Sequence, residues 1–186
     1  MDADTLRIAA FLLGSCFLII ISRRSLTSVA SHGFYRFFAW ESILALLLVN
    51  LPFWFRDPFS FAQIVSWVLL CGSLFVLVPA ILLLRAAGKP APERKDSALY
   101  EFERTSELVT SGIYKYIRHP MYASLLFLSV GAWLKNISPE SFALLLASSL
   151  FLTATAKADE KECIRYFGSE YEEYKKRTTM FVPFIY

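Results

Sequence analysis

The stretch PFSFAQIVSWVLLCGSLFVLVPAILLL, residues 58–84, decides the class of fold. It runs for 27 residues without a charged side chain. A helix needs about 20 predominantly apolar residues to cross the hydrocarbon core of a bilayer. Soluble domains instead break their apolar residues into periodic stripes. The stretch therefore predicts a membrane-spanning helix.

Four further apolar runs lie on either side of it. Residues 8–22 are uncharged, and residues 37–55 carry only Glu41. Residues 121–134 and 141–156 are shorter, and Asn136, Ser138 and Pro139 between them have the composition of a turn. The chain is 56% hydrophobic. We expect an all-α polytopic membrane protein with about five transmembrane helices, the last two forming a short helical hairpin.

The distribution of basic residues predicts the orientation. If the N-terminus lies outside, the inside segments are residues 23–36, 85–118 and 157–186, which hold 16 of the 19 Lys and Arg. Cytoplasmic segments collect Lys and Arg, so the C-terminus is expected in the cytoplasm. A cleaved signal peptide is the alternative for the first run, but acids precede that run and arginines follow it. The net charge of +3 then reflects topology, and we predict no nucleic-acid binding.

The chain is expected to form a single integral membrane domain over residues 1–186. Residues 1–84 supply three spans, and residues 85–186 supply a polar loop, the hairpin and a C-terminal cytoplasmic amphipathic helix. That helix is predicted from about Lys157 to Lys176, with Gly168 as a weak point. One face of it carries residues at helical spacing: Glu160, Ile164, Phe167, Tyr171 and Tyr174. The three cysteines show no metal-binding spacing, so no metal site is predicted.

Two polar segments are the places to look for chemistry. One is ELVTSGIYKYIRHPMY, residues 107–122, and the other begins with the acidic pair Asp159 and Glu160 and continues into FGSEYEEY, residues 167–174. Each has a plain structural explanation. Arg118 and His119 can anchor a helix at the membrane surface, and Pro120 suits the first turn of a helix. The two acids can simply favour the positive end of a helix.

Taken together, these motifs resemble the isoprenylcysteine carboxyl methyltransferase and phospholipid N-methyltransferase superfamily of integral membrane enzymes. The resemblance covers roughly residues 108–183. It implies an S-adenosylmethionine site at the cytoplasmic face and a methyltransferase that acts on a lipid or prenyl-type acceptor. The implied catalytic residues are Arg118 and Glu160. The implied cofactor-binding residues are Ser106, Glu107, Leu108, Val109, Tyr114, His119, Pro120, Met121, Tyr122, Asp159 and Glu160.

The residue types suit the charges of S-adenosylmethionine. Its sulfonium and amino groups are positive and match carboxylates, while its carboxylate matches arginine, histidine and backbone N–H groups. The isoprenylcysteine branch usually has an arginine about one turn before the acidic pair, where this chain has residues 153–156, TATA. A further arginine often precedes the final proline, where this chain has Met180. Both departures leave open whether the acceptor is a prenylcysteine or another lipid, and whether the enzyme methylates oxygen or nitrogen.

Two other functions remain open at this stage. The C-terminal segment, including Cys163 and residues 183–186, also resembles the end of the NADPH-dependent membrane sterol reductases, which have about twice as many spans. A non-catalytic membrane interaction protein that has kept the fold is the second alternative. The sequence does not indicate an oligomeric state.

Overall fold

The computed structural model describes residues 2–89, 91 and 103–183. The closing residues Phe184, Ile185 and Tyr186, which carry part of the reductase resemblance, lie outside the described residues. In the described part the long elements are helices: α1 (Ala3–Ser22), α2 (His32–Asn50), α3 (Phe61–Ala87), α4 (Pro120–Trp133), α5 (Pro139–Phe167) and α6 (Ser169–Arg177). Short 3-10 helices include η1 (Leu51–Phe53) and η3 (Gly112–Lys115). The predicted all-α class is confirmed.

Local sequence signals begin most of these helices. The side chains of Asp2, Ser31, Ser60 and Ser138 each accept a hydrogen bond from the backbone three residues later, which is the usual N-cap contact. Ser138 and Ser141 also form a reciprocal capping box, and Pro139 follows Ser138 at the start of the helix. The predicted turn of the hairpin is therefore where α5 begins.

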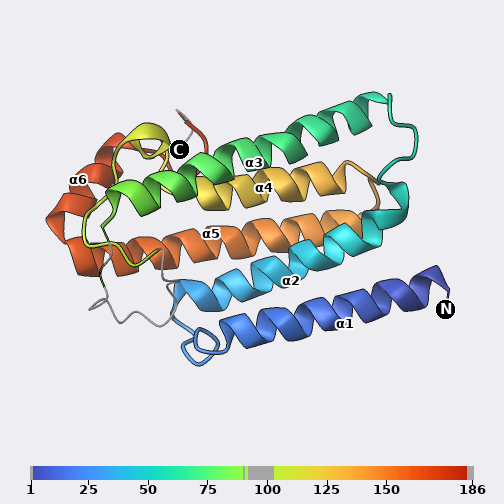
Figure 1. Ribbon diagram of the computed structural model, residues 1–186, viewed down its shortest axis with the longest axis horizontal. Coiled ribbons are helices and arrows are strands. Elements are labelled where there is room, and N and C mark those ends of the chain that lie inside the picture. The colour runs from blue at the N-terminus through green and yellow to red at the C-terminus, as the bar shows by residue number, and fades with distance from the viewer. Residues whose placement is uncertain (1, 90, 92–102, 184–186) are drawn as a thin grey trace.

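Four helices are long and apolar enough to cross a membrane: α1, α2 continued through η1, α3 and α5. At a rise of about 1.5 Å per residue, the 14-residue α4 is roughly 21 Å long, shorter than a bilayer core of about 30 Å. Figure 1 shows the five helices lying side by side along the long axis, in the spatial order α1, α2, α5, α4 and α3. The prediction of a bundle of about five apolar helices is confirmed: four are long enough to span a membrane, and α4 is a shorter apolar helix.

The C-terminal helices differ from the predicted boundaries. The sequence predicted a separate helix over residues 157–176, but α5 continues without a break from Pro139 to Phe167. The charged residues after Ala156 do not end the helix, because Lys, Glu and Asp do not prevent helical backbone geometry. The break comes at Gly168, whose φ of 61° and ψ of −136° lie in a region that glycine alone adopts readily. The acidic pair therefore lies on the extension of a membrane helix.

Hydrogen bonds connect neighbouring helices of the bundle. The Ser15 hydroxyl of α1 donates to the Glu41 carboxylate of α2 over 2.7 Å. The Asn50 amide donates to the Ala132 carbonyl over 2.8 Å, and the Ser66 hydroxyl donates to the Gly131 carbonyl over 2.6 Å. At Gly131 the helices α3 and α4 approach so closely that a Cβ would lie 3.0 Å from Leu70. Small residues at such contacts are typical of membrane helix packing.

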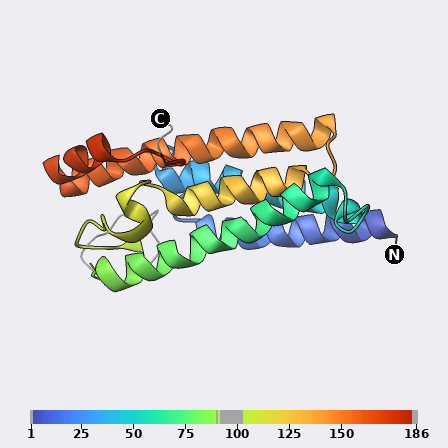
Figure 2. The ribbon, with the colours of Figure 1, turned by 90° about the horizontal axis from the view of Figure 1, so that it is seen from above.

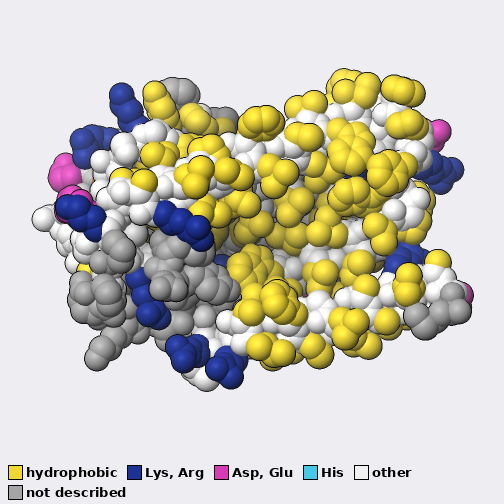
Figure 3. Space-filling view, viewed as in Figure 1, with side chains coloured by type: hydrophobic (Ala, Val, Ile, Leu, Met, Phe, Trp, Pro, Cys, Tyr) yellow, Lys and Arg dark blue, Asp and Glu magenta, His cyan; other side chains and the backbone are white. Residues whose placement is uncertain are grey.

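The polar end of the bundle lies opposite the N-terminus. Figures 1 and 2 both show α6, the segment around η3 and the C-terminal part of α5 at one end, and the N-terminus with the α4–α5 turn at the other. Figure 3 shows apolar side chains over the middle of this face and most of its Lys and Arg side chains near the α6 end. The molecule therefore has the charge distribution of an integral membrane protein, with its polar segments gathered at one end.

Candidate active site

The two polar segments singled out in the sequence, residues 107–122 and the segment that begins with Asp159, meet at the α6 end of the bundle. Pro120 is the first residue of α4, and His119 is the N-cap residue directly before it. At Gly112 the φ angle is 57°, and a Cβ there would lie 2.4 Å from Leu83 of α3. This glycine therefore lets η3 pack against α3. The acidic pair approaches the same place from α5.

His119 lies between the two acids. It is only 5% exposed, with Nδ1 3.5 Å from an Asp159 carboxylate oxygen and Nε2 3.5 Å from a Glu160 carboxylate oxygen. Its ring stacks on Tyr122, with the ring centroids 5.4 Å apart. Burial is the largest influence on the pKa of His119 and lowers it, but the hydrogen bonds and charges of the two acids outweigh burial and raise the pKa overall. The surroundings therefore favour the imidazolium form.

Asp159 is surrounded by a histidine and by neutral hydrogen-bond donors. It accepts hydrogen bonds from the Tyr122 hydroxyl over 3.2 Å and from the Cys163 thiol over 3.6 Å. Among the described residues, its ion-pair partner is His119, and no lysine or arginine pairs with it. A partly buried carboxylate whose ion-pair partner is a histidine can accept a positively charged ligand group.

Glu160 has the opposite environment. It accepts from Arg118 Nε over 2.7 Å and pairs with Lys175 Nζ at 2.5 Å. The Arg118 guanidinium also donates to the backbone carbonyls of Lys175 and Thr178 at the end of α6. Charged hydrogen bonds of this kind are stronger than neutral ones. The pair of Arg118 and Glu160 therefore joins α5, α6 and the segment before α4.

Backbone contacts add a second connection between these segments. The N–H groups of Arg118 and His119 donate to the carbonyls of Thr179 and Met180 over 2.9 and 3.2 Å. The Tyr174 hydroxyl of α6 donates to the Tyr114 carbonyl over 2.6 Å. Burial raises the pKa of Tyr174, so the hydroxyl keeps the proton that it donates. The C-terminal segment thus helps to fix the backbone around the candidate site.

A cavity of about 90 Å³ lies where these groups meet. Eight of the predicted cofactor-binding residues line it: Leu108, Val109, Tyr114, His119, Pro120, Met121, Tyr122 and Asp159. Arg118 lines it as well, while Glu160 lies beyond His119 and does not. Small-molecule sites are commonly about 300–1,000 Å³, so side chains of the lining have to move for a molecule the size of S-adenosylmethionine.

Ser106 and Glu107 lie beside the cavity, not in its lining. The backbone N–H groups of Ser106 and Glu107 donate to the carbonyls of Lys89 and Gly88, and the Glu107 carboxylate pairs with the Lys89 ammonium group. In this structure the two residues attach the loop to the end of α3. Their predicted contact with a cofactor stays a prediction.

Sequence reasoning did not assign several residues of the lining to the site. They are Leu84, Glu103, Thr105, Cys163, Phe167, Tyr171 and Tyr174. The helical spacing of the last three was visible in the sequence and could have indicated a shared surface. Glu103 and Thr105 carry no such pattern. Glu103 is held by Arg36 of α2, whose guanidinium donates to both carboxylate oxygens over 3.1 Å.

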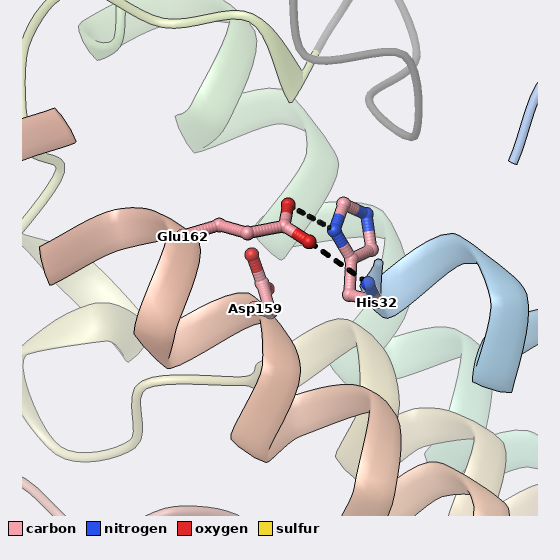
Figure 4. Close-up of side chains that lie close together, drawn as sticks. All are labelled: His32, Asp159 and Glu162. Carbon is pink, nitrogen blue, oxygen red and sulfur yellow. Dashed lines mark hydrogen bonds and ion pairs between the residues drawn. The ribbon is translucent and has the colours of Figure 1, made fainter. Parts of the chain in front are cut away.

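A second connection to α2 involves His32, Asp159 and Glu162 (Figure 4). One oxygen of Glu162 is 2.6 Å from His32 Nδ1, and the other accepts from the His32 backbone N–H over 2.9 Å. One potential ligand atom from each of the three residues falls within 4.8 Å of the others, as a metal site would need. Glu162 already uses both oxygens on His32, so we interpret the cluster as a link between α2 and α5.

Comparisons with known proteins point to one family. A family profile described as phospholipid methyltransferase matches residues 93–171. Protein-S-isoprenylcysteine O-methyltransferase from Homo sapiens is 32% identical over 124 residues, which cover 65% of this chain and 43% of the human protein. The protein of the same name from Saccharomyces cerevisiae (strain ATCC 204508 / S288c) is 32% identical over 160 residues, which cover 84% of this chain and 63% of the yeast protein. The matched region therefore spans less than two thirds of either relative.

Proposed function

Because the chain belongs to the family of membrane methyltransferases that includes the phospholipid methyltransferases and the isoprenylcysteine O-methyltransferases, we propose that it transfers a methyl group from S-adenosylmethionine to a lipophilic acceptor. The observation that carries the proposal is the meeting of His119 and Asp159 at one cavity beside the membrane-spanning helices. The two residues lie 40 positions apart in the sequence, and both belong to the motifs that resemble this family.

The charges around the cavity suit the donor. When bound, S-adenosylmethionine supplies an electrophilic methyl group on a sulfonium, and its sulfur keeps the electron pair of the broken S–C bond as a neutral thioether. Asp159 offers a carboxylate to a positive group of this ligand, whereas protonated His119 offers a donor to its carboxylate. Most of the barrier reduction in such a displacement comes from positioning, so the rigid connections around Tyr114 and Arg118 matter for the reaction.

Arg118 and Glu160 are proposed to act at the acceptor. Their ion pair borders the donor cavity through Arg118, and Glu160 is placed away from that cavity. If the acceptor is a carboxylate it is already a nucleophile, and Arg118 can orient it. If the acceptor is an amine, its nitrogen has to lose a proton before its lone pair can bond to the methyl carbon, and Glu160 is proposed to receive that proton.

The acceptor is proposed to be a lipid or a prenylated molecule, as the names of the relatives suggest. The N-terminus is proposed to lie outside the membrane and the site at the cytoplasmic face, since the site and the N-terminus lie at opposite ends of the bundle. The organisation into a single domain, with residues 1–84 and 85–186 as its two parts, stays a prediction.

Binding measurements in detergent test the proposal before any acceptor is known. We expect calorimetric titration of the purified protein to give saturable binding of S-adenosylmethionine and none of NADPH. Incubation with methyl-labelled S-adenosylmethionine and a membrane lipid extract should then label a lipid-soluble product. Saturable NADPH binding without binding of S-adenosylmethionine would instead favour the reductase alternative, and binding of neither would favour an interaction protein.

A further inference from the structure

A second and larger cavity lies on the other side of the ion pair between Arg118 and Glu160. Its volume is about 780 Å³. Arg118 lines both cavities, so this residue belongs to the wall between them. The apolar part of the lining includes Ile164, Met180 and Phe181. The volume falls within the range typical of small-molecule sites, about 300–1,000 Å³.

The polar lining of this cavity is strongly basic. Among the described residues of the lining, Arg118, Lys157, Lys161 and Lys175 are cations and Glu160 is the single acid, which gives these five residues a formal charge of +3. Arg118 and Lys175 both pair with Glu160. Their charges are therefore partly compensated within the protein.

Lys157 and Lys161 remain without such compensation. Among the described residues neither forms an ion pair within 4.0 Å, and both are exposed at the cavity. They lie four residues apart on α5, so their side chains project from the same face. Like charges at this spacing repel each other, whereas an anion bound between them would be attracted to both.

General attraction to anionic headgroups explains lysines at a membrane surface, but it does not require a cavity. Here the two lysines line a half-open cavity that also has an apolar lining and shares the residue Arg118 with the donor cavity. This combination matches a molecule with an anionic group, an apolar chain and a nucleophile that must reach the methyl donor.

We propose that the larger cavity receives the acceptor and that Lys157 and Lys161 bind an oxyanion of it, either a phosphate or a carboxylate. This inference rests on the proposed methyltransferase function. Lysine binds such groups as a point charge, so the same pair can hold either oxyanion.

Two pairs of soluble amphiphiles test the site and distinguish the two oxyanions. The phosphate pair is dihexanoyl phosphatidylethanolamine and dihexanoylglycerol, and the carboxylate pair is N-acetyl-S-farnesylcysteine and its methyl ester. Each is titrated in a neutral detergent into the wild type, the double variant Lys157→Gln and Lys161→Gln, and the control Lys176→Gln. Lys176 is exposed on α6, pairs with Glu173 and does not line the cavity. Glutamine keeps a similar helix propensity at all three positions.

The wild type is expected to bind the member that carries the oxyanion, in at least one pair, at least tenfold more tightly than the member that lacks it. The double variant should lose that preference, and the control should keep it. Equal binding of both members by the wild type, or an unchanged preference in the double variant, would overturn the proposal. Titration of S-adenosylmethionine into the same three samples reports on the methyltransferase function separately, and we expect the three affinities to agree within about twofold because these lysines do not line the donor cavity.

Discussion

Replacement of Asp159 by asparagine is the sharpest test of the donor cavity. The change removes one negative charge and keeps the size of the side chain and an oxygen that accepts from Tyr122, which now lies 3.2 Å from the carboxylate. Among the described residues Asp159 has no lysine or arginine partner, so its charge is the one most available to a cationic ligand. We expect weaker binding of S-adenosylmethionine with little change in the fold.

The size of the effect follows from the position of the carboxylate. Two unit charges 4 Å apart attract by about 4 kcal/mol at an effective dielectric constant of 20, and desolvation of both groups offsets part of this. Hydrogen bonds to charged groups contribute about 1.5–3 kcal/mol. A loss of about 2 kcal/mol corresponds to a roughly 30-fold higher Kd.

Titrations with S-adenosylmethionine and with S-adenosylhomocysteine identify the group that Asp159 contacts. S-adenosylhomocysteine lacks the sulfonium charge and keeps the amino group. A loss confined to S-adenosylmethionine would assign the contact to the sulfonium, and equal losses would assign it to the amino group. The control is Glu173→Gln, which removes the same charge from an exposed site on α6. If both affinities in the Asp159 variant stayed within twofold of the wild type, the assignment of this carboxylate to the donor would be wrong.

Three further predictions concern stability, each measured by thermal unfolding in detergent. The pKa of His119 is raised, so the stabilisation from its charged form is complete below pH 6.5 and is lost as the pH rises through the folded-state pKa. The Tm of the wild type should therefore fall above pH 6.5. If the difference in Tm between the wild type and His119→Gln did not vary with pH, this prediction would be wrong. Tyr174→Phe leaves the Tyr114 carbonyl without its donor and should cost about 1–3 kcal/mol, whereas an unchanged Tm would show that this bond is dispensable. In Gly168→Ala the new Cβ would have no atom within 4 Å, so a loss of stability would come from the positive φ angle of the backbone and not from a clash. We expect a loss of about 1–3 kcal/mol. A Tm equal to that of the wild type would contradict this prediction.

The sequence predicted those features that depend on local patterns. Uncharged runs predicted the spans, and Ser138 with Pro139 predicted the turn of the hairpin, because caps and apolar length act within a few residues. The meeting of His119 with Asp159 followed from the resemblance to a family. Periodicity alone carries no information about contacts between distant segments.

The features that were not predicted depend on three-dimensional neighbours. The continuity of α5 could not be seen, because charged residues are compatible with a helix that leaves the membrane and with a new helix alike. The place of Glu103 in the cavity depends on Arg36, 67 residues away. Lys157 and Lys161 contributed only to the topology prediction, since the cavity that they line also requires Thr178 to Phe181 from the C-terminal segment.

The acidic pair illustrates how one sequence motif can serve two sites. Successive residues of an α-helix project about 100° apart, so Asp159 and Glu160 cannot face the same surface of α5. Asp159 lines the donor cavity, and Glu160 lines the basic cavity with Arg118 and Lys175. His119 contacts both acids and lies at the boundary. Exchange of the two acids keeps the composition and the net charge, but we expect the double variant Asp159→Glu and Glu160→Asp to lose affinity for S-adenosylmethionine. The longer glutamate at position 159 would crowd a cavity of about 90 Å³. The shorter aspartate at position 160 would lie farther from Arg118.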